Sequence, residues 1–326
     1  MRRFTGVGGG TRATAGNTTT PNYQRLSGDE LESRSERLWE RYAACDLCAY
    51  DCGVDRTAGE IGACRVDDTA YVSSHFPHFG EEECLRGTHG SGTIFLAHCN
   101  MTCVFCQNFE TSHEAQGESA TPEEIAEMAL DLQSKGCHNV NFVSPTHHSP
   151  HLVEAVRIAR ERGLDLPIVW NCGGYERKEI LEQLEGVVDV FMPDVKWGDD
   201  AAAAKYSKAP NYWTNVQDSL REMHRQVGDL ELGSDGLATE GLLVRHLVMP
   251  NHVESATRVL TFLAEELSTE TYVNVMAQYT PYYEAASEAR YEEIGRTITG
   301  EEYRAVVDHA HEAGLTRVET DDHGLR

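Results

Sequence analysis

Short apolar runs alternate with helix-length segments through most of this 326-residue chain, and this alternation constrains the fold more than any other feature. Strands separated by helices predict a parallel sheet with right-handed crossovers. A curved, barrel-like α/β architecture is therefore expected, although an open doubly wound sheet satisfies the same pattern. Six runs are too short for helices and are interpreted as strands: 93–97, 139–144, 167–171, 187–192, 242–248 and 272–276.

The segment after the first run carries clear helix-boundary signals. Thr121 stands before Pro122, and Glu124 follows three residues after Thr121, which is the pattern of a capping box. Gly136 ends the apolar periodicity that follows. We expect a helix between these points, as the crossover between the first and second strands.

The chain divides into three regions by composition. Residues 1–27 are rich in Gly, Thr and Asn and hold few large apolar side chains, which predicts a disordered tail. Residues 28–86 begin with a charged helix at 29–42 and continue as a Cys-bearing, Gly-interrupted segment, which predicts a small metal-binding module. Residues 87–326 hold the α/β pattern and C-terminal helices.

The charge balance excludes several classes of partner. The chain has 28 Lys and Arg against 53 Asp and Glu, a formal net charge of −25, which argues against nucleic acid and anionic membrane surfaces. Only five of the basic residues are Lys, and such an acidic surface resembles that of halophilic proteins, although an acidic mesophilic protein fits as well. No apolar stretch reaches the roughly 18 residues of a membrane span, so we expect a cytoplasmic protein.

Three cysteines, Cys99, Cys103 and Cys106, follow the first predicted strand, where α/β folds collect functional side chains. Three thiolates can bind one face of a cuboidal iron-sulfur cluster and leave its fourth iron open to a small molecule. The alternatives are a zinc site that lacks one ligand and a group of buried thiols. A closed structural zinc site needs a fourth ligand, and none adjoins these three.

The C-x3-C-x2-C spacing, with Phe105 before the last Cys, resembles the signature of the radical S-adenosylmethionine (SAM) superfamily. Further segments between about Cys45 and Pro281 are similar to the pyruvate formate-lyase activating enzyme-like group, of the PflX type. These segments are Gly90 to Phe95, Gln107-Asn108, Ser144 to His147, Tyr175, Pro193 to Lys196 and Arg245 to Pro250.

The resemblance implies a partial (β/α)6 TIM-like barrel with a [4Fe-4S] cluster at Cys99, Cys103 and Cys106. It also implies reductive cleavage of SAM to a 5′-deoxyadenosyl radical that abstracts hydrogen, and a reducing partner such as ferredoxin or flavodoxin. One feature departs from the family pattern, since Ser144 to His147 stand where many members carry Gly-Gly-Glu. The same resemblance assigns cofactor-binding roles to Phe105, Asn171, Asp194, Lys196 and Arg245.

A second cysteine set, Cys45, Cys48, Cys52 and Cys64, lies in the segment that is poor in core residues. A tetrahedral metal would supply stability that such a segment lacks. Zinc and an auxiliary iron-sulfur cluster use the same ligands, so the spacing does not choose between them, and disulfides are the non-metal alternative.

Four further residues have an expected position in the fold. Cys84 could replace one of the four cysteines or face the active site, whereas Cys137 and Cys172 are expected to be buried packing residues. His147 is expected to line the site.

Three functions remain open at this point. The first is a radical SAM enzyme similar to pyruvate formate-lyase activating enzymes, with an unassigned substrate. The second is an activase that installs a glycyl radical on a protein partner. The third is a non-catalytic zinc-binding interaction protein, which only the four-cysteine set supports.

Overall fold

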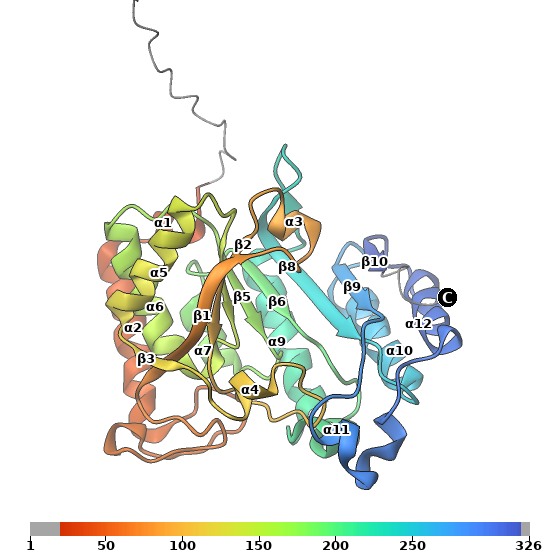
Figure 1. Cartoon of the computed structure of the whole chain (residues 1–326). Coiled ribbons are helices and arrows are strands. Elements are labelled where there is room, and N and C mark those ends of the chain that lie inside the picture. Colours follow the sequence, from red (N-terminus) through yellow and green to blue (C-terminus); the bar gives the residue numbers. More distant parts are fainter. Residues whose placement is uncertain (1–19, 321–326) are drawn as a thin grey trace, which may run out of the picture.

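A ten-stranded mixed sheet organises residues 20–320, the part of the chain that the computed structural model describes (Figure 1). Its strand order is β10-β9-β8-β6-β5-β4-β2-β1-β3, with β7 (Glu231–Leu232) paired to β8, so the sheet is open. At one edge, β1 (Ala70–His78) and β3 (Glu118–Ala120) run antiparallel to their neighbours. The other strands are parallel: β2 (Ser91–Leu96), β4 (Val140–Val143), β5 (Ile168–Cys172), β6 (Val190–Pro193), β8 (Ala238–Leu247), β9 (Tyr272–Met276) and β10 (Val318–Thr320).

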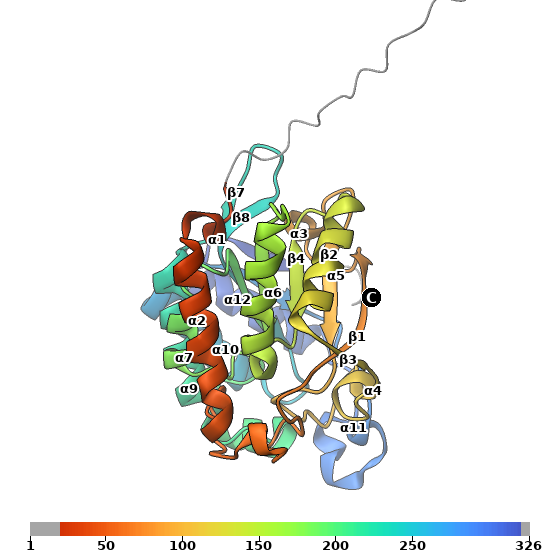
Figure 2. The same cartoon turned by 90° about the vertical axis from the view of Figure 1, so that its left-hand side faces the viewer.

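The crossover helices pack outside this sheet, and α2, α6 and α5 lie side by side there (Figure 2). The predicted capping box of α5 is present, because Thr121 accepts from Glu124 N–H and Glu124 accepts from Thr121 N–H. The longer helices are α2 (Gly28–Glu40), α5 (Pro122–Ser134), α6 (Ser149–Glu161), α7 (Lys178–Leu184), α9 (Tyr212–Val227), α10 (Val253–Phe262) and α12 (Gly300–Glu312). The shorter ones are α1 (Asn22–Arg25), α3 (Glu83–Arg86), α4 (Phe109–Ser112), α8 (Asp200–Ala202) and α11 (Glu284–Ser287).

The six predicted strands are present and parallel, and the predicted α/β architecture is confirmed, with the sheet in an open form. Strand β1 was missed, although it forms part of this sheet rather than a separate module. Its side chains do not alternate cleanly between buried and exposed, since the strand lies near an edge. The pattern that identifies half-buried strands is therefore weak there.

The predicted disordered tail lies outside the described residues from 1 to 19, but the prediction is wrong for residues 20–27. Helix α1 occupies Asn22–Arg25, and Tyr23 is fully buried with its hydroxyl bonded to Leu164 O and Leu166 O. Asn22 N–H donates to Asp189, 2.6 Å away. A single aromatic side chain with two carbonyl acceptors anchors a segment whose composition alone predicts no structure.

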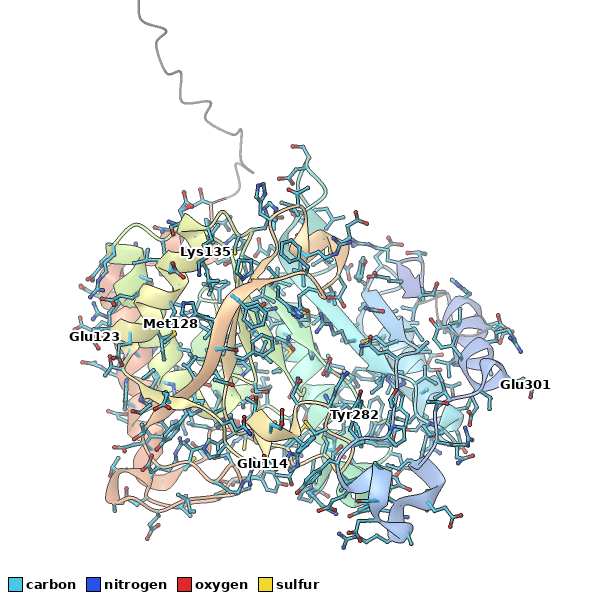
Figure 3. All side chains as sticks on the ribbon, in the orientation of Figure 1. Glu114, Glu123, Met128, Lys135, Tyr282 and Glu301 are labelled. Atoms are coloured by element: carbon cyan, nitrogen blue, oxygen red, sulfur yellow. The ribbon has the colours of Figure 1, made fainter. Side chains whose placement is uncertain are left out.

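Acidic side chains project from several parts of the outside of the molecule (Figure 3). Glu123 and Glu301 project from outer helices on opposite sides of the ribbon, and Glu114 projects near α4 (Figure 3). Among the helices of residues 20–320, none combines the length and the apolar character needed to cross a bilayer.

Gly241, in β8, is required by two independent constraints. Its φ of +126° disfavours an L side chain, and an added Cβ would lie 2.4 Å from Leu230 Cα and 2.5 Å from Asp229 O. We expect Gly241→Ala to lower the free energy of unfolding by about 2–5 kcal/mol, because backbone strain and overpacking add. Urea unfolding measures the effect, with Gly28→Ala as the matched control, because an added Cβ there meets nothing within 4 Å. A loss no larger than the control's would contradict the strain argument.

Buried histidines make the folded state sensitive to acid. Burial lowers the pKa of His151 and of His246 to about 4, whereas unfolded His titrates near 6.5. The unfolded state therefore binds more protons between these values, and stability falls as pH drops through that window, by roughly 1.4 kcal/mol per pH unit for each residue. Urea unfolding at pH 7, 6 and 5 should show this decline. His151→Leu should reduce the slope of stability against pH by roughly 1.4 kcal/mol per pH unit, the contribution of one proton. A slope equal to that of the wild-type protein would refute the assignment.

Candidate functional site

The segment Cys99–Cys106, here called the cluster loop, follows β2 directly and turns across the carboxyl ends of the parallel strands. His98 begins the turn with a φ of +66°. Each of the three thiols has a hydrogen-bond partner. Cys99 Sγ accepts from Met101 N–H at 3.3 Å, Cys103 Sγ lies 3.1 Å from Ser207 Oγ, and Cys106 Sγ lies 3.1 Å from Ser112 Oγ.

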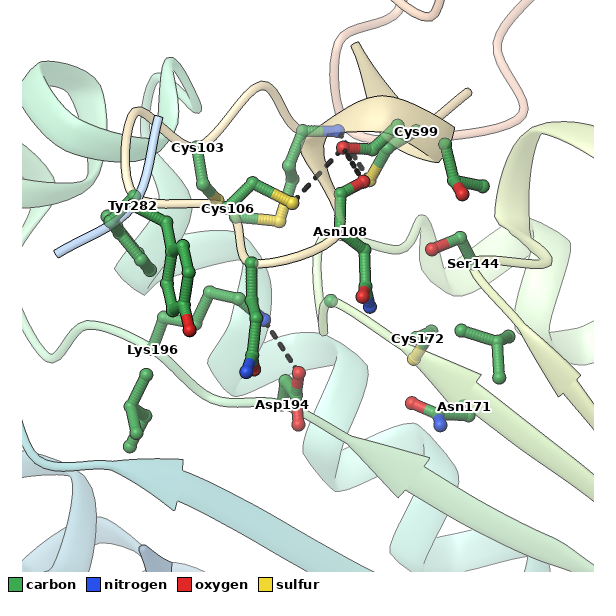
Figure 4. A pocket seen from close by; sticks show the side chains of 18 of the residues that line it. Cys99, Cys103, Cys106, Asn108, Ser144, Asn171, Cys172, Asp194, Lys196 and Tyr282 are labelled. Carbon is green, nitrogen blue, oxygen red and sulfur yellow. Dashed lines mark hydrogen bonds and ion pairs between the residues drawn. The ribbon is translucent and has the colours of Figure 1, made fainter. Parts of the chain in front are cut away.

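The three thiols line one cavity of about 230 Å³ at the mouth of the sheet (Figure 4). Four of the five residues predicted to bind cofactor line the same cavity: Phe105, Asn171, Asp194 and Lys196. Asn171 is the last residue but one of β5, and Asp194 and Lys196 follow β6. The carboxyl ends of neighbouring parallel strands thus bring together side chains that lie up to about 100 residues apart in the sequence.

Burial and Lys196 act in opposite directions on the cluster-loop thiols. Burial raises the pKa of Cys99 to about 11 and of Cys103 to about 12, and it raises that of Cys106 as well. The positive charge of Lys196 partly offsets this increase at all three thiols. A metal binds the thiolate form, so a nearby cation favours the state that a metal requires.

Lys196 and Asp194 form an ion pair on the wall opposite the cluster loop, with Nζ 2.9 Å from Oδ2 (Figure 4). Burial alone would lower the pKa of Lys196, but the charges of Asp194 and Cys103 raise it overall, so the ammonium stays charged. The second carboxylate oxygen of Asp194, Oδ1, is buried and has no hydrogen-bond partner. A buried acceptor of this kind suits a ligand that carries a donor.

Tyr212, which the sequence analysis missed, holds these strand ends in place. Its hydroxyl accepts from Lys196 N–H at 3.1 Å and lies 2.8 Å from Gly173 O and 3.2 Å from Asp194 O. Gly173 also matters by its lack of a side chain, because a Cβ there would lie 2.6 Å from Met101 Sδ. The cluster loop can therefore lie directly on the turn after β5.

Arg245 lies in an adjoining cavity of about 810 Å³, not among the residues lining the cluster cavity. Its guanidinium is bound by the carboxylates of Glu81 and Glu82, with Nε 2.8 Å from Glu82 Oε1. Asn274 donates to the same Glu82 oxygen at 2.7 Å. The two cavities share Asn171 and Asp194 in their walls, so they lie next to each other. With Nε and Nη2 bound to these carboxylates, Arg245 forms part of the wall of the second cavity.

Three other residues singled out in the sequence, His147, Cys172 and Cys84, are all buried. His147 does not line either cavity: it is buried, and its Nε2 lies 3.2 Å from Ala97 O. Cys172 is buried as expected but also contributes to the cluster cavity. Cys84 is buried with Leu85 in a smaller apolar cluster and lines neither cavity.

A segment after β9 that includes Gln278, Tyr279 and Tyr282 closes one side of the cluster cavity. In the sequence, only its position after a strand could have indicated this role.

The cysteines of the second set, here called the four-cysteine module, lie between α2 and β1, and three of them, Cys45, Cys48 and Cys64, are buried. Burial raises the pKa of Cys48 and of Cys64, and the charges of neighbouring thiols of the module raise both further. Cys52 Sγ accepts from Ala63 N–H at 3.4 Å, and a Cβ at Gly62 would lie 2.8 Å from that sulfur. Within residues 20–320, no three His, Cys, Asp or Glu side chains are grouped so that they could hold a single metal ion.

Comparison with known proteins defines the class to which this fold and cavity belong. A model of the radical SAM superfamily matches residues 93–238. An uncharacterized protein of Methanocaldococcus jannaschii is 34% identical over 294 residues, which cover 87% of this chain and 79% of that protein. The chain therefore belongs to the radical SAM superfamily.

Solved structures of lower similarity were also found. A domain of a pyruvate-formate lyase-activating enzyme from Bacteroides vulgatus is 15% identical, with a TM-score of 0.41, and the match covers 56% of this chain and 98% of that one. A radical SAM methyltransferase from Sphaerobacter thermophilus is 15% identical, with a TM-score of 0.48, and the match covers 93% and 96% of the two chains.

Superfamily membership implies a [4Fe-4S] cluster and SAM, and the cavity suits both groups. Three thiols share one wall, which is the donor set that a cluster with one open iron requires. These thiols are not arranged to hold one ion, and they need not be, because each thiolate of a cuboidal cluster binds a different iron. The charged Lys196 and the unpartnered Asp194 Oδ1 match the carboxylate and amino groups of an amino acid.

Proposed function

We propose that Cys99, Cys103 and Cys106 bind a [4Fe-4S] cluster and that the chain uses it to cleave SAM reductively. A [4Fe-4S] cluster held by these three thiolates would supply the electron for reductive cleavage of SAM to methionine and a 5′-deoxyadenosyl radical, which would abstract a hydrogen atom from the substrate. The observation that carries this proposal is the single cavity that holds all three thiols together with Asp194 and Lys196. The third hypothesis, a zinc-binding protein without catalysis, gives no reason for that arrangement.

The remaining residues of the cavity have distinct roles in this proposal. Lys196 binds the carboxylate of the methionine moiety, and Asp194 Oδ1 accepts from its amino group. Asn171, at the end of β5, orients the same moiety. Phe105 offers its ring to the adenine and is itself fixed by edge contacts with Trp197 and Tyr279, each with ring centroids 5.9 Å away.

The adjoining cavity is the proposed substrate space. Its volume of about 810 Å³ is in the range of small-molecule sites, and it opens directly onto the residues that would hold SAM. Because this cavity is partly open, the bound substrate would have to exclude water from the radical site. We therefore propose a radical enzyme of unassigned substrate, similar to pyruvate formate-lyase activating enzymes. It would work in the cytoplasm, where thiols stay reduced, and would take electrons from a ferredoxin or flavodoxin.

Product analysis tests the proposal. The anaerobically reconstituted and reduced protein is incubated with SAM, and 5′-deoxyadenosine is quantified by chromatography. Formation of 5′-deoxyadenosine that depends on reductant is the expected result, and its absence from protein with a full iron content would refute the proposal. Candidate glycyl-radical partners are then added under electron paramagnetic resonance, and a glycyl signal on the partner would identify the chain as an activase.

A further inference from the structure

The second cavity, which Arg245 lines, has two ends of different composition. One end shares Asn171 and Asp194 with the cluster cavity. The other end includes the segment before and within α3, and both views place α3 at the opposite end of the sheet from α4, the short helix that follows the cluster loop (Figures 1 and 2). A molecule in this cavity would therefore extend from the proposed SAM site toward α3.

Carboxylates outnumber cations in the wall of the second cavity. Within residues 20–320, five carboxylates and two guanidinium groups line it, besides the imidazole of His78. The carboxylates belong to Glu81, Glu82, Glu83, Asp194 and Glu319, and the guanidinium groups belong to Arg86 and Arg245. Of the five carboxylates, only that of Asp194 also lines the cluster cavity, where Lys196 pairs with it. The excess of negative charge therefore lies away from the cluster loop.

The acidity of the molecular surface does not account for two of these carboxylates. The side chains of Glu81 and Glu82 are only 5% and 1% exposed. Burial would raise the pKa of Glu81, but the charge of Arg245 and a hydrogen bond with His78 lower it overall to about 2, so this carboxylate is ionised. Arg245 binds both carboxylates, and one guanidinium offsets only one negative charge. A buried excess charge is unfavourable unless another cation compensates it.

Apolar side chains lie between this acidic region and the cluster loop. Phe95, Val143 and Met276 line both cavities and therefore stand at the junction between them. The ring of Phe95 stacks on that of Phe76, with ring centroids 5.3 Å apart, which holds it in place. A hydrocarbon segment binds favourably to such a surface because apolar area is removed from water. Along the two cavities the wall thus changes from thiols, through apolar side chains, to carboxylates.

Asn171, at the same junction, is a polar side chain without a partner. It is 8% exposed and lines both cavities, and its side-chain amide makes no hydrogen bond in the described part of the chain. The amide points from β5 into the pocket (Figure 4). Buried amides in proteins are usually hydrogen-bonded, so this one indicates a ligand at the junction. Because an amide has donor and acceptor atoms, Asn171 can contact SAM and a second molecule together.

We propose that the second cavity binds an organic cation, with its ammonium or guanidinium group at the carboxylates and its alkyl segment on the apolar junction. A small amine and a basic side chain of a peptide present the same group. As substrate of the proposed reaction, the molecule loses a hydrogen atom from an alkyl carbon. That C–H bond breaks, the hydrogen atom joins the 5′ carbon of the deoxyadenosyl radical, and 5′-deoxyadenosine and a substrate radical result. Binding of the cation stands by itself, while its role as substrate rests on the proposed function.

Equilibrium binding to the reconstituted full-length protein, with SAM and without reductant, tests the cation site. At constant ionic strength, n-pentylammonium and n-pentylguanidinium should bind about tenfold more tightly than neutral 1-pentanol, and pentanoate should bind more weakly than 1-pentanol. No binding of either cation, affinities equal to that of 1-pentanol, or preferred binding of pentanoate would overturn the proposal. A capped peptide with a single Lys, beside its norleucine analogue, distinguishes a peptide side chain from a free amine as the source of the cation.

Substitutions that remove one charge each locate the cation. Glu83→Gln and Glu319→Gln should each weaken binding of n-pentylammonium roughly three- to tenfold, because each removes a carboxylate from the wall and leaves the partners of Arg245 in place. Arg86→Gln should strengthen binding, since it removes a competing cation. Glu301→Gln is the matched control, because this exposed residue lies outside both cavities. Equal binding in all four variants, or weaker binding in Arg86→Gln, would refute the charge argument.

Transfer of deuterium tests the role as substrate. With SAM and reductant, n-pentylammonium that is deuterated on its carbon atoms should yield 5′-deoxyadenosine that contains deuterium, which mass spectrometry detects. Product without deuterium at saturating n-pentylammonium would overturn the role as substrate and would leave both the cation site and the proposed function standing. If no 5′-deoxyadenosine forms in protein of full iron content, that result counts instead against the proposed function.

Discussion

Cys103→Ala is expected to abolish the formation of 5′-deoxyadenosine from SAM, to about 1% of the wild-type rate or less, a change of about 2.7 kcal/mol or more in the activation barrier. Cys103 is buried and lines the cluster cavity, and the positive charge of Lys196 partly offsets the increase that burial causes in its pKa. Its loss leaves two thiols on a loop that needs three to bind the cluster while one iron stays open. Anaerobic iron and sulfide analysis, beside product analysis, measures the effect.

Cys137→Ala provides the matched control. Cys137 is also buried, at 3% exposure, but it packs near Gly92 at the start of β2, away from the cavity. This variant should lose some stability and keep the wild-type iron content and activity. Full activity in Cys103→Ala, or an iron content equal to the control's, would contradict the assignment of the cluster loop.

The parallel sheet could be predicted because its strands are buried on both faces. Val169, Val190 and Leu243 are inaccessible to solvent, so these strands appear in the sequence as continuous apolar runs. Such runs can be recognised without knowledge of the fold. Strand β1 carries no such signal, since only its first residues are well buried. Helix α1 is stabilised by contacts of Tyr23 with residues more than 140 positions away, which no local pattern contains.

The candidate site could be predicted where its residues follow the rule that functional side chains gather at the carboxyl ends of parallel strands. Asn171 lies near the end of β5, and Asp194 and Lys196 follow β6, so the parallel topology brings all three to the cavity. Arg245 shows the limit of this rule. It belongs to β8 and forms a parallel bridge with Asp194, yet its side chain is directed to Glu81 and Glu82, from a segment that precedes the first parallel strand. Only the folded chain reveals that partner.

The contacts between the two cysteine sets were likewise not accessible from the sequence. Spacing within each set indicates a metal site, but nothing in the spacing says that Tyr175 O bonds to both segments. The turn after β5 makes this contact possible because Gly173 allows Met101 to approach it closely. The contact between the two segments is thus a property of one strand end.

Lys196→Met is expected to weaken equilibrium binding of SAM by about 10- to 100-fold while leaving the iron content unchanged. A charge-assisted hydrogen bond to a carboxylate contributes about 1.5–3 kcal/mol, and each 1.4 kcal/mol corresponds to a factor of ten in affinity. The substitution also leaves the Asp194 carboxylate without its ion-pair partner in a partly buried wall. Binding of SAM to the anaerobic protein measures the effect, with iron quantified in the same samples.

Two further variants separate the charge of Lys196 from the packing of its side chain. Lys205→Met is the matched control, because Lys205 pairs with Glu293 on the surface and lies outside both cavities. Lys196→Arg should recover part of the affinity, since it restores the cation but not the position of the ammonium. If Lys196→Met binds SAM as tightly as Lys205→Met does, the carboxylate of SAM is held elsewhere, and Lys196 serves only to compensate the charge of Asp194.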